Sequence, residues 1–315
     1  MNANIASPTQ PALDSTLTLA LAVASKAAYN YYSGDPITPP DGYTQREGWT
    51  GWDAFLDTGS EEKYGLVFQS LTDSGTFIFA FRGTDSDLDG WEDVHFLTTD
   101  FVPSQGSISP TPHVASGFYG IYDSLGEGMT QSMRQQLFSL LATYQPTQLY
   151  VTGHSLGAAL SQLFSLDLAI SQPTTSTNIN FASPMVGTDS WQTAYDATIA
   201  VGSSIRVYNY WDYVPSLPPD AFGYNTVGAG FVTSFYVKGE WFPHALSRHS
   251  IVNLTTVLSN ALPLNPQQWV GEFPDYVDSS WTMESAAPPA TAPVRWVEKI
   301  GQHMAFERSL RPAAA

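Results

Sequence analysis

The stretch Q-L-Y-V-T-G-H-S-L-G-A-A-L, residues 148–160, decides the fold. Residues 149–152 are rich in β-forming side chains, and residues 158–160 are helix-forming. Between them, residues 153–157 read G-H-S-L-G and match G-x-S-x-G, the pattern of a serine on a sharp strand-to-helix turn. We therefore expect a strand that leads into a helix through a nucleophile elbow, with Ser155 at its tip.

The chemistry of such an elbow explains its residue types. Glycines flank the serine because neighbouring backbone comes too close for a Cβ atom. The following helix directs N–H groups and its positive end at a developing oxyanion. The alternative is an ordinary βα turn with a capping serine. His154 is next to Ser155, and on so tight a turn we expect it to pack beside the site rather than act as the base.

Outward from this stretch, short β-rich runs alternate with helical patterns. We expect strands over residues 64–71, 76–81, 148–152, 178–182, 204–208 and 231–237. We expect helices over residues 15–32, 117–142, 158–170 and 295–310, and loops over residues 33–62. This alternation predicts an α/β fold with a mostly parallel central sheet that is covered by helices on both faces.

Length and repeat structure indicate one domain. The chain has 315 residues, 43% of them hydrophobic, which suffices for a large core. It has no internal repeat and no low-complexity linker. We expect a single domain over residues 1–315, with an N-terminal arm at 1–13 and a C-terminal extension at about 260–315, where prolines interrupt the pattern.

Composition excludes several function classes. Twelve basic and 29 acidic residues give a net charge of −17, so nucleic acid is not an expected partner. The absence of cysteine excludes disulfides, thiolate metal sites and cysteine nucleophiles. No apolar run approaches the roughly 20 residues of a membrane span. No basic residue precedes residues 17–24, so this stretch is read as a helix and not as a signal peptide, although we expect a secreted protein.

A catalytic acid is expected after a later strand, because the chain order in this type of site is Ser, then Asp or Glu, then His. Residues 204–208 form such a strand and lead to Asp212. A buried carboxylate there would hold an imidazole in its productive tautomer. A turn-capping role for Asp212 is the alternative, and Asp189, Asp196 and Asp220 are rivals without a strand before them.

Three histidines follow Asp212 and are candidates for the base. His249 precedes a helix-like run at residues 250–254, so a loop-to-helix boundary would hold it rigid. His244 lies in an aromatic segment, and His303 lies inside an expected helix. We expect His249 to be the base, with His244 and His303 as alternatives.

A second oxyanion donor is expected after an earlier strand. Residues 81–84, F-R-G-T, close the run 76–81. The backbone N–H groups of Thr84 and Leu156 would converge on a substrate carbonyl oxygen, and the Thr84 hydroxyl would add a bond. The same residues also fit a simple strand-ending turn.

Five sequence blocks, in this order, resemble the class 3 lipase family, which includes fungal triacylglycerol lipases, feruloyl esterases and many bacterial relatives. They are residues 78–84, 114–118 with Tyr122, 151–160, 181–187 and 206–215. The resemblance covers roughly residues 16–255.

This resemblance implies an α/β-hydrolase fold with Ser155 as nucleophile, Asp212 as acid, and Thr84 with Leu156 as oxyanion donors. Residues 249–254 are similar to the histidine-bearing segment of bacterial and plant members. The chain departs from the family where Met185 replaces a common arginine, in lacking the fungal disulfides, and in its tail after about residue 260.

In similar lipases, the segment after the oxyanion loop is a lid. We expect a lid at about residues 85–103, because Leu88, Trp91 and Val94 fall near one face of a helix. Closed, its apolar side would cover the site; open, it would meet a lipid surface. An ordinary surface helix is the alternative.

The function expected from the sequence is hydrolysis of carboxylic esters of lipids, as by a triacylglycerol lipase, at an oil–water interface. Feruloyl esterase and phospholipase A1 are alternatives within the same chemistry. A catalytically silent binding module is an alternative from another class. We expect no cofactor and no catalytic metal ion.

Overall fold

The computed structural model describes residues 11–53, 59–84, 96–172, 174–237, 244–265, 267, 272–273, 283–285, 301–302 and 304–305. The helices are α1 (Ser15–Ser33), α2 (Ser116–Asp123), α3 (Met133–Tyr144), α4 (Leu156–Ser171), α5 (Asp189–Thr198), α6 (His244–His249) and α7 (Ile251–Ala261). The strands of the main sheet are β1 (Tyr43–Asp53), β2 (Ser60–Ser70), β3 (Thr76–Phe81), β6 (Gln148–Gly153), β7 (Ser176–Phe181), β9 (Ser204–Asn209) and β11 (Ala229–Thr233).

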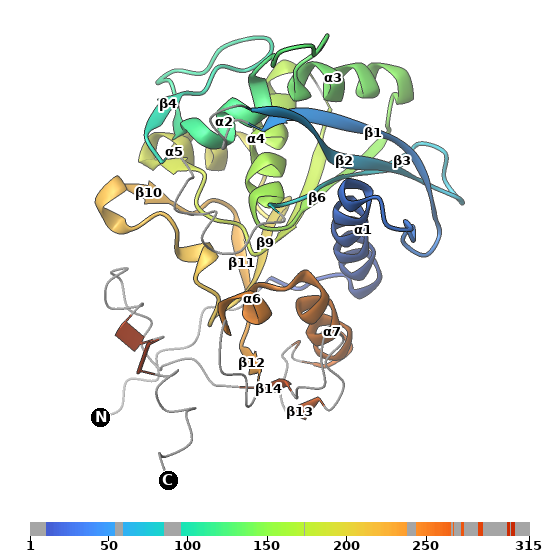
Figure 1. The fold of residues 1–315 in the computed structure, drawn as a ribbon, viewed down its shortest axis with the longest axis vertical. Coiled ribbons are helices and arrows are strands. Elements are labelled where there is room, and N and C mark those ends of the chain that lie inside the picture. Colours follow the sequence, from blue (N-terminus) through green and yellow to red (C-terminus); the bar gives the residue numbers. More distant parts are fainter. Residues whose placement is uncertain are drawn as a thin grey trace.

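The main sheet runs in the order β1-β2-β3-β6-β7-β9-β11. The first three strands are antiparallel neighbours, whereas β3, β6, β7, β9 and β11 are parallel. The carboxyl ends of the parallel strands therefore meet at one edge, where loops from distant parts of the sequence come together. The expected α/β architecture with a mostly parallel sheet is confirmed (Figure 1).

Strand β3 shows why both faces of the sheet are covered. Its phenylalanines at 77, 79 and 81 belong to one buried cluster, which also holds side chains of α2, α3 and α4. Its intervening residues Ile78 and Ala80 belong to a second cluster with side chains of α1 and α7. Since successive side chains of a strand point to opposite faces, an almost wholly apolar strand requires a helical layer on each side. Figure 1 shows α1 and α7 apart from the group formed by α2, α3 and α4.

The expected loops at residues 33–62 are wrong, because β1 lies within this range. Its glycines are required by packing: a Cβ on Gly48 would lie 2.7 Å from the Tyr31 ring, and one on Gly51 would lie 2.5 Å from Met133. The expected helix over residues 117–142 is two helices, since residues 124–132 separate α2 from α3. Gly48 and Gly51 therefore mark places where β1 packs closely against other elements, and they do not mark a loop.

Two smaller sheets flank the main one. A four-stranded sheet has the order β10-β8-β5-β4, and a three-stranded sheet has the order β12-β14-β13. Their strands are β4 (Thr98–Asp100), β5 (His113–Ala115), β8 (Gly187–Thr188), β10 (Tyr224–Asn225), β12 (Phe235–Val237), β13 (Glu272–Phe273) and β14 (Met283–Ser285). The predicted C-terminal extension therefore pairs with β12, and residues 98–100 of the predicted lid range form a strand. Within the described residues, no helix has the length and apolar character needed to cross a membrane.

Candidate active site

Ser155 lies on the sharp turn between β6 and α4, at the carboxyl edge of the parallel strands. Its backbone has φ 60° and ψ −128°, a conformation that a side-chain-bearing residue rarely adopts. The turn is tight on both sides: a Cβ on Gly153 would lie 2.3 Å from the carbonyl oxygen of Gly157, and one on Gly157 would lie 2.4 Å from that of Phe81. The glycines thus permit the turn, and the surrounding backbone keeps the strained serine in place.

The Ser155 hydroxyl belongs to a chain of hydrogen bonds. The His249 imidazole lies with Nε2 2.8 Å from Ser155 Oγ and Nδ1 2.7 Å from Asp212 Oδ2. An ionised carboxylate only accepts, so Nδ1–H donates to Asp212 and Nε2 accepts from the serine hydroxyl. All three side chains are buried, with 1% of Asp212 exposed and 9% of His249. The structure thus brings together the serine, acid and histidine that the sequence placed in this order.

Asp212 is held by the backbone after β9. Its N–H donates to the carbonyl oxygen of Asn209 at 3.1 Å, and its Oδ1 accepts from the N–H of Val214 at 3.0 Å. One carboxylate oxygen is therefore anchored while the other faces His249. The rivals lie elsewhere: Asn225 donates to Asp189, and Asp196 is exposed and accepts from the N–H of Gly228 at 3.4 Å.

His249 is the last residue of α6, and Ser250 caps the next helix, α7, by accepting from the N–H of Asn253. Asn209 joins this segment to the acid loop. Its Nδ2 donates to the carbonyl oxygens of Phe235 at 2.9 Å and Arg248 at 3.3 Å, and its Oδ1 accepts from the N–H of Phe235 at 3.0 Å. The base is therefore carried on a segment fixed by side-chain hydrogen bonds.

His154 packs beside the site, as expected, and does not contact Ser155 Oγ through its ring. Its Nε2 lies 2.6 Å from the carbonyl oxygen of His249, and its Nδ1 lies 2.8 Å from the Tyr29 hydroxyl. A carbonyl only accepts, so Nε2–H donates to it and the neutral ring accepts from Tyr29 at Nδ1. Burial and then the charge of His249 lower the pKa of His154 well below its ordinary 6.5. His154 therefore stays neutral and supports the backbone of His249.

The two predicted oxyanion donors lie on either side of Ser155. Leu156 is the first residue of α4, so its N–H has no acceptor within the helix. Thr84 follows Gly83, and a Cβ on Gly83 would lie 2.8 Å from Ser155 Cβ and 2.7 Å from the His154 carbonyl oxygen. The loop that carries Thr84 thus packs directly against the nucleophile.

Several predicted residues lie outside the described part of the chain. These are the lid residues Leu88, Trp91 and Val94, the side chain of His244, and His303. Among the residues that the structure does describe, no group of three or more His, Asp or Glu side chains could hold a metal ion.

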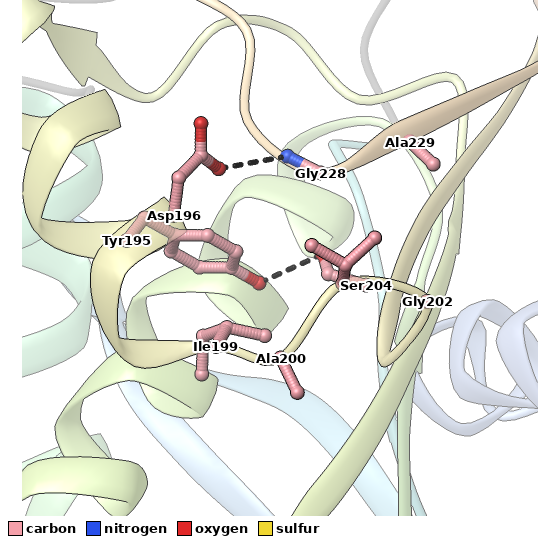
Figure 2. A pocket seen from close by; sticks show the side chains of 9 residues that line it. Tyr195, Asp196, Ile199, Ala200, Gly202, Ser204, Gly228 and Ala229 are labelled. Atoms are coloured by element: carbon pink, nitrogen blue, oxygen red, sulfur yellow. Dashed lines mark hydrogen bonds between the residues drawn. The ribbon is translucent and has the colours of Figure 1, made fainter.

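A hollow elsewhere on the molecule is distinct from this site. It measures about 310 Å³ and is lined by the end of α5 and the starts of β9 and β11, including Tyr195, Asp196 and Ser204 (Figure 2). Tyr195 hydrogen-bonds Ser204 at 3.0 Å there. Because β9 and β11 begin at this hollow, it lies at the amino edge of the parallel strands, opposite Ser155.

Sequence reasoning missed Asn209 and Tyr29 as parts of the site. Asn209 stood in one of the five family-like blocks, directly before the acid loop, and that placement was the available signal. Tyr29 lies near the end of an alanine-rich helix, and no local pattern marks it.

Comparison with known proteins places this geometry in context. A family model described as lipase (class 3) matches residues 78–222, which include Thr84, Ser155 and Asp212. The chain is 34% identical over 175 residues to phospholipase A1-II 3 of Oryza sativa subsp. japonica, covering 48% of this chain and 40% of that protein. It is 30% identical over 154 residues to a lipase of Rhizopus niveus, covering 47% and 36%. The match thus spans about two-fifths of these relatives.

Solved structures show the same fold at low sequence identity. The Lip2 lipase of Yarrowia lipolytica superposes with a TM-score of 0.58 at 20% identity, over 74% of this chain and 84% of that one. A triacylglycerol lipase of Penicillium expansum superposes with a TM-score of 0.54 at 20% identity, over 71% and 82%.

Proposed function

Because this chain belongs to the class 3 lipase family, we propose that it hydrolyses carboxylic esters of lipids, with Ser155 as nucleophile, His249 as base and Asp212 as acid. The observation that supports this most strongly is the hydrogen-bonded chain from Ser155 Oγ through both nitrogens of His249 to Asp212. This arrangement activates a serine because the imidazole accepts its proton while the carboxylate stabilises the imidazolium that forms.

The first half-reaction forms an acyl-enzyme. Ser155 Oγ attacks the ester carbonyl carbon as its proton passes to Nε2 of His249. The carbonyl oxygen becomes an oxyanion, and the N–H groups of Thr84 and Leu156 stabilise it. The carbon–oxygen bond to the alcohol then breaks, and Nε2 returns the proton to the departing alkoxide.

The second half-reaction releases the acid. A water molecule gives a proton to Nε2 of His249 and attacks the acyl carbon, and the same two N–H groups receive the oxyanion. The bond to Ser155 Oγ breaks, and His249 returns a proton to the serine. No step requires a metal ion or an organic cofactor.

This proposal has two forms, which differ in the alcohol part of the lipid ester that is cleaved. Triacylglycerol is the leading substrate, because the family model that matches is described as lipase (class 3) and a curated relative, from Rhizopus niveus, is named lipase. Phospholipid cleaved at its sn-1 ester is the second candidate, because several curated relatives that this chain matches are named phospholipase A1.

The proposal includes a lid at about residues 85–103 with Leu88, Trp91 and Val94 on its apolar side. Its support is the amphipathic sequence and its place directly after Thr84. Hydrolysis should then rise sharply above the solubility limit of the substrate. A smooth saturation curve through that limit, unchanged in Trp91→Ala, would contradict the lid.

Secretion also stays a prediction, tested by where the protein accumulates in the cells that make it.

An ester panel tests the function. The purified protein is assayed on triacylglycerols of several chain lengths, on phosphatidylcholine labelled at either acyl position, and on a feruloyl ester, with Ser155→Ala as the control. We expect fatty acid release that depends on Ser155. Release from sn-1 of phosphatidylcholine alone would favour the phospholipase, and no release from any ester would contradict the proposal.

A further inference from the structure

Arg82 is a buried cation next to the predicted oxyanion loop. Only 2% of the residue is exposed, and among the described residues no carboxylate forms an ion pair with it. One of its terminal nitrogens, Nη2, is buried and has no hydrogen-bond partner within the described part of the chain. Removing a guanidinium from water is costly when no anion compensates it, so this placement calls for a specific explanation.

The guanidinium is instead fixed by carbonyl oxygens and aromatic rings. Its Nε donates to the carbonyl oxygen of Lys63 at 2.7 Å, and its Nη1 donates to that of Gly83 at 2.8 Å. Its Cζ lies 3.9 Å from the ring centre of Tyr32 and 4.2 Å from that of Tyr64. The guanidinium thus lies over two aromatic rings while two of its nitrogens donate to carbonyl oxygens, a combination that suits a guanidinium and not an ammonium.

The bond to Gly83 constrains the predicted oxyanion donor. The Gly83 carbonyl and the Thr84 N–H belong to one peptide plane, which is trans. In a trans peptide these two groups point in opposite directions. An arginine that holds the carbonyl on one side therefore fixes the N–H on the other. Gly83 itself packs against Ser155 Cβ, so this peptide borders the nucleophile.

We propose that Arg82 is a positioning residue that orients the Gly83–Thr84 peptide, so that the Thr84 N–H is directed at the developing oxyanion. This inference rests on the proposed ester hydrolysis. It makes Arg82 act on the transition state through Thr84, without contact with substrate. Loss of this orientation should lower kcat and leave KM nearly unchanged, because the oxyanion exists only in the transition state.

Arg206 provides a matched control for the structural role of a buried arginine. It is 8% exposed, its Nε donates to the carbonyl oxygen of Val227 at 2.8 Å, and its Cζ lies 5.5 Å from the ring centre of Tyr208. Val227 is remote from Ser155 in the fold, since it lies two residues before the start of β11, at the amino edge of the parallel strands. Arg82→Lys and Arg206→Lys therefore make the same chemical change in similar surroundings, but only the first touches the oxyanion loop.

The experiment compares both variants with the wild type in ester hydrolysis and in binding of a trifluoromethyl ketone. Ser155 adds to this ketone with transfer of its proton to His249, so the ketone oxygen becomes an oxyanion. For Arg82→Lys we expect kcat and the affinity for the ketone to fall together, each by roughly 100-fold. The affinity for the matching secondary alcohol, which does not react with Ser155 and forms no oxyanion, should stay unchanged. For Arg206→Lys we expect neither kcat nor the affinity for the ketone to change by more than about 3-fold.

Equal kcat in the two folded variants would overturn the role of Arg82, as would equal losses of ketone and alcohol affinity. If Arg82→Lys does not fold, Tyr32→Leu decides, because it removes one of the two rings beside the guanidinium and keeps the hydrogen bonds of Arg82. Its kcat should fall several-fold relative to Tyr31→Leu, whose ring contacts Lys63 instead, and equal values would overturn the proposal. A wild type that neither hydrolyses esters nor binds the ketone contradicts the proposed function itself.

Discussion

The nucleophile and the base are held in place by different means. Ser155 sits on a turn whose geometry is set by backbone contacts within residues 153–157 and with the end of β3. His249 sits on a segment that is fixed by side chains from elsewhere, namely Asn209 and His154. The turn at Ser155 is constrained sterically and has no room for an added atom. The position of His249 depends on several hydrogen bonds, each of which a single substitution can remove.

This difference bears on how the two halves of the site respond to change. A substitution in the elbow should disturb folding and catalysis together, because the same backbone serves both. A substitution around His249 should lower activity in steps. The acid loop belongs with the base in this respect, since the Asn209 side chain also accepts from the N–H of Trp211, directly before Asp212, at 3.4 Å.

The largest effect is expected from Asp212→Asn, which keeps the shape of the side chain but removes its charge. The amide favours the wrong tautomer of His249, and kcat should fall by about 10,000-fold. Steady-state kinetics measures it, and Asp41→Asn, the same change at an exposed aspartate, serves as the control. A loss below tenfold would show that Asp212 does not orient the base.

The next effect tests the steric side of the comparison. Gly157→Ala should lower the free energy of unfolding by about 3 kcal/mol or more, because its Cβ would lie 2.4 Å from the Phe81 carbonyl oxygen. Gly120→Ala in α2 is the control, since its Cβ meets nothing nearer than 4.0 Å and should stabilise by about 0.5 kcal/mol. Urea unfolding of both variants decides, and equal stabilities would refute the steric account.

Asn209→Ala tests the hydrogen-bonded side. It removes the hydrogen bonds from Asn209 to the carbonyl oxygens of Phe235 and Arg248, so we expect a loss of about 2 kcal/mol in stability and at least about tenfold in kcat. Asn180→Ala is the control: Asn180 is equally buried but donates only to Asn178 within β7, so its kcat should persist. Unchanged kcat in Asn209→Ala would show that Asn209 does not position the base.

The smallest effect concerns pH. The pKa of His154 is lowered in the folded state, so below about pH 6.5 the unfolded chain binds a proton that the folded chain does not. The contribution of His154 to the free energy of unfolding is therefore fully present above about pH 6.5. As the pH falls below this value, the free energy of unfolding decreases by at most about 1.4 kcal/mol per pH unit. His154→Gln should flatten the curve measured by thermal unfolding. Parallel curves for wild type and His154→Gln would contradict the assignment.

The same comparison explains how much of the molecule was predictable from its sequence. The elbow was predictable, because its strand, turn and helix follow one another within residues 148–171 and each has a local signature. The β3 strand was predicted with its observed bounds, since its apolar run is short and continuous. Asp212 was predictable from chain order and the strand before it.

What failed depended on tertiary contacts. β1 was read as loop because Gly48 and Gly51 look like turn residues, yet they make room for Tyr31 and Met133. The sequence favoured His249 among the three histidines after the acid, but its hydrogen bonds with Asp212 and Ser155 are long-range contacts that only the structure shows. No sequence signal marks the packing of Arg82 against Tyr32 and Tyr64, because the two tyrosines lie on different elements.

The most direct test of the central claim is the rate at which a fluorophosphonate ester labels Ser155, read by mass spectrometry of the labelled peptide. The claim is that His249, and not His154, activates this serine. Wild type should be labelled once per chain at Ser155, and His249→Ala should react at least about 1,000-fold more slowly. His154→Gln should lose less than about tenfold, because its amide can still donate to the His249 carbonyl oxygen. Labelling of His249→Ala at the wild-type rate, or of another residue, would contradict the account.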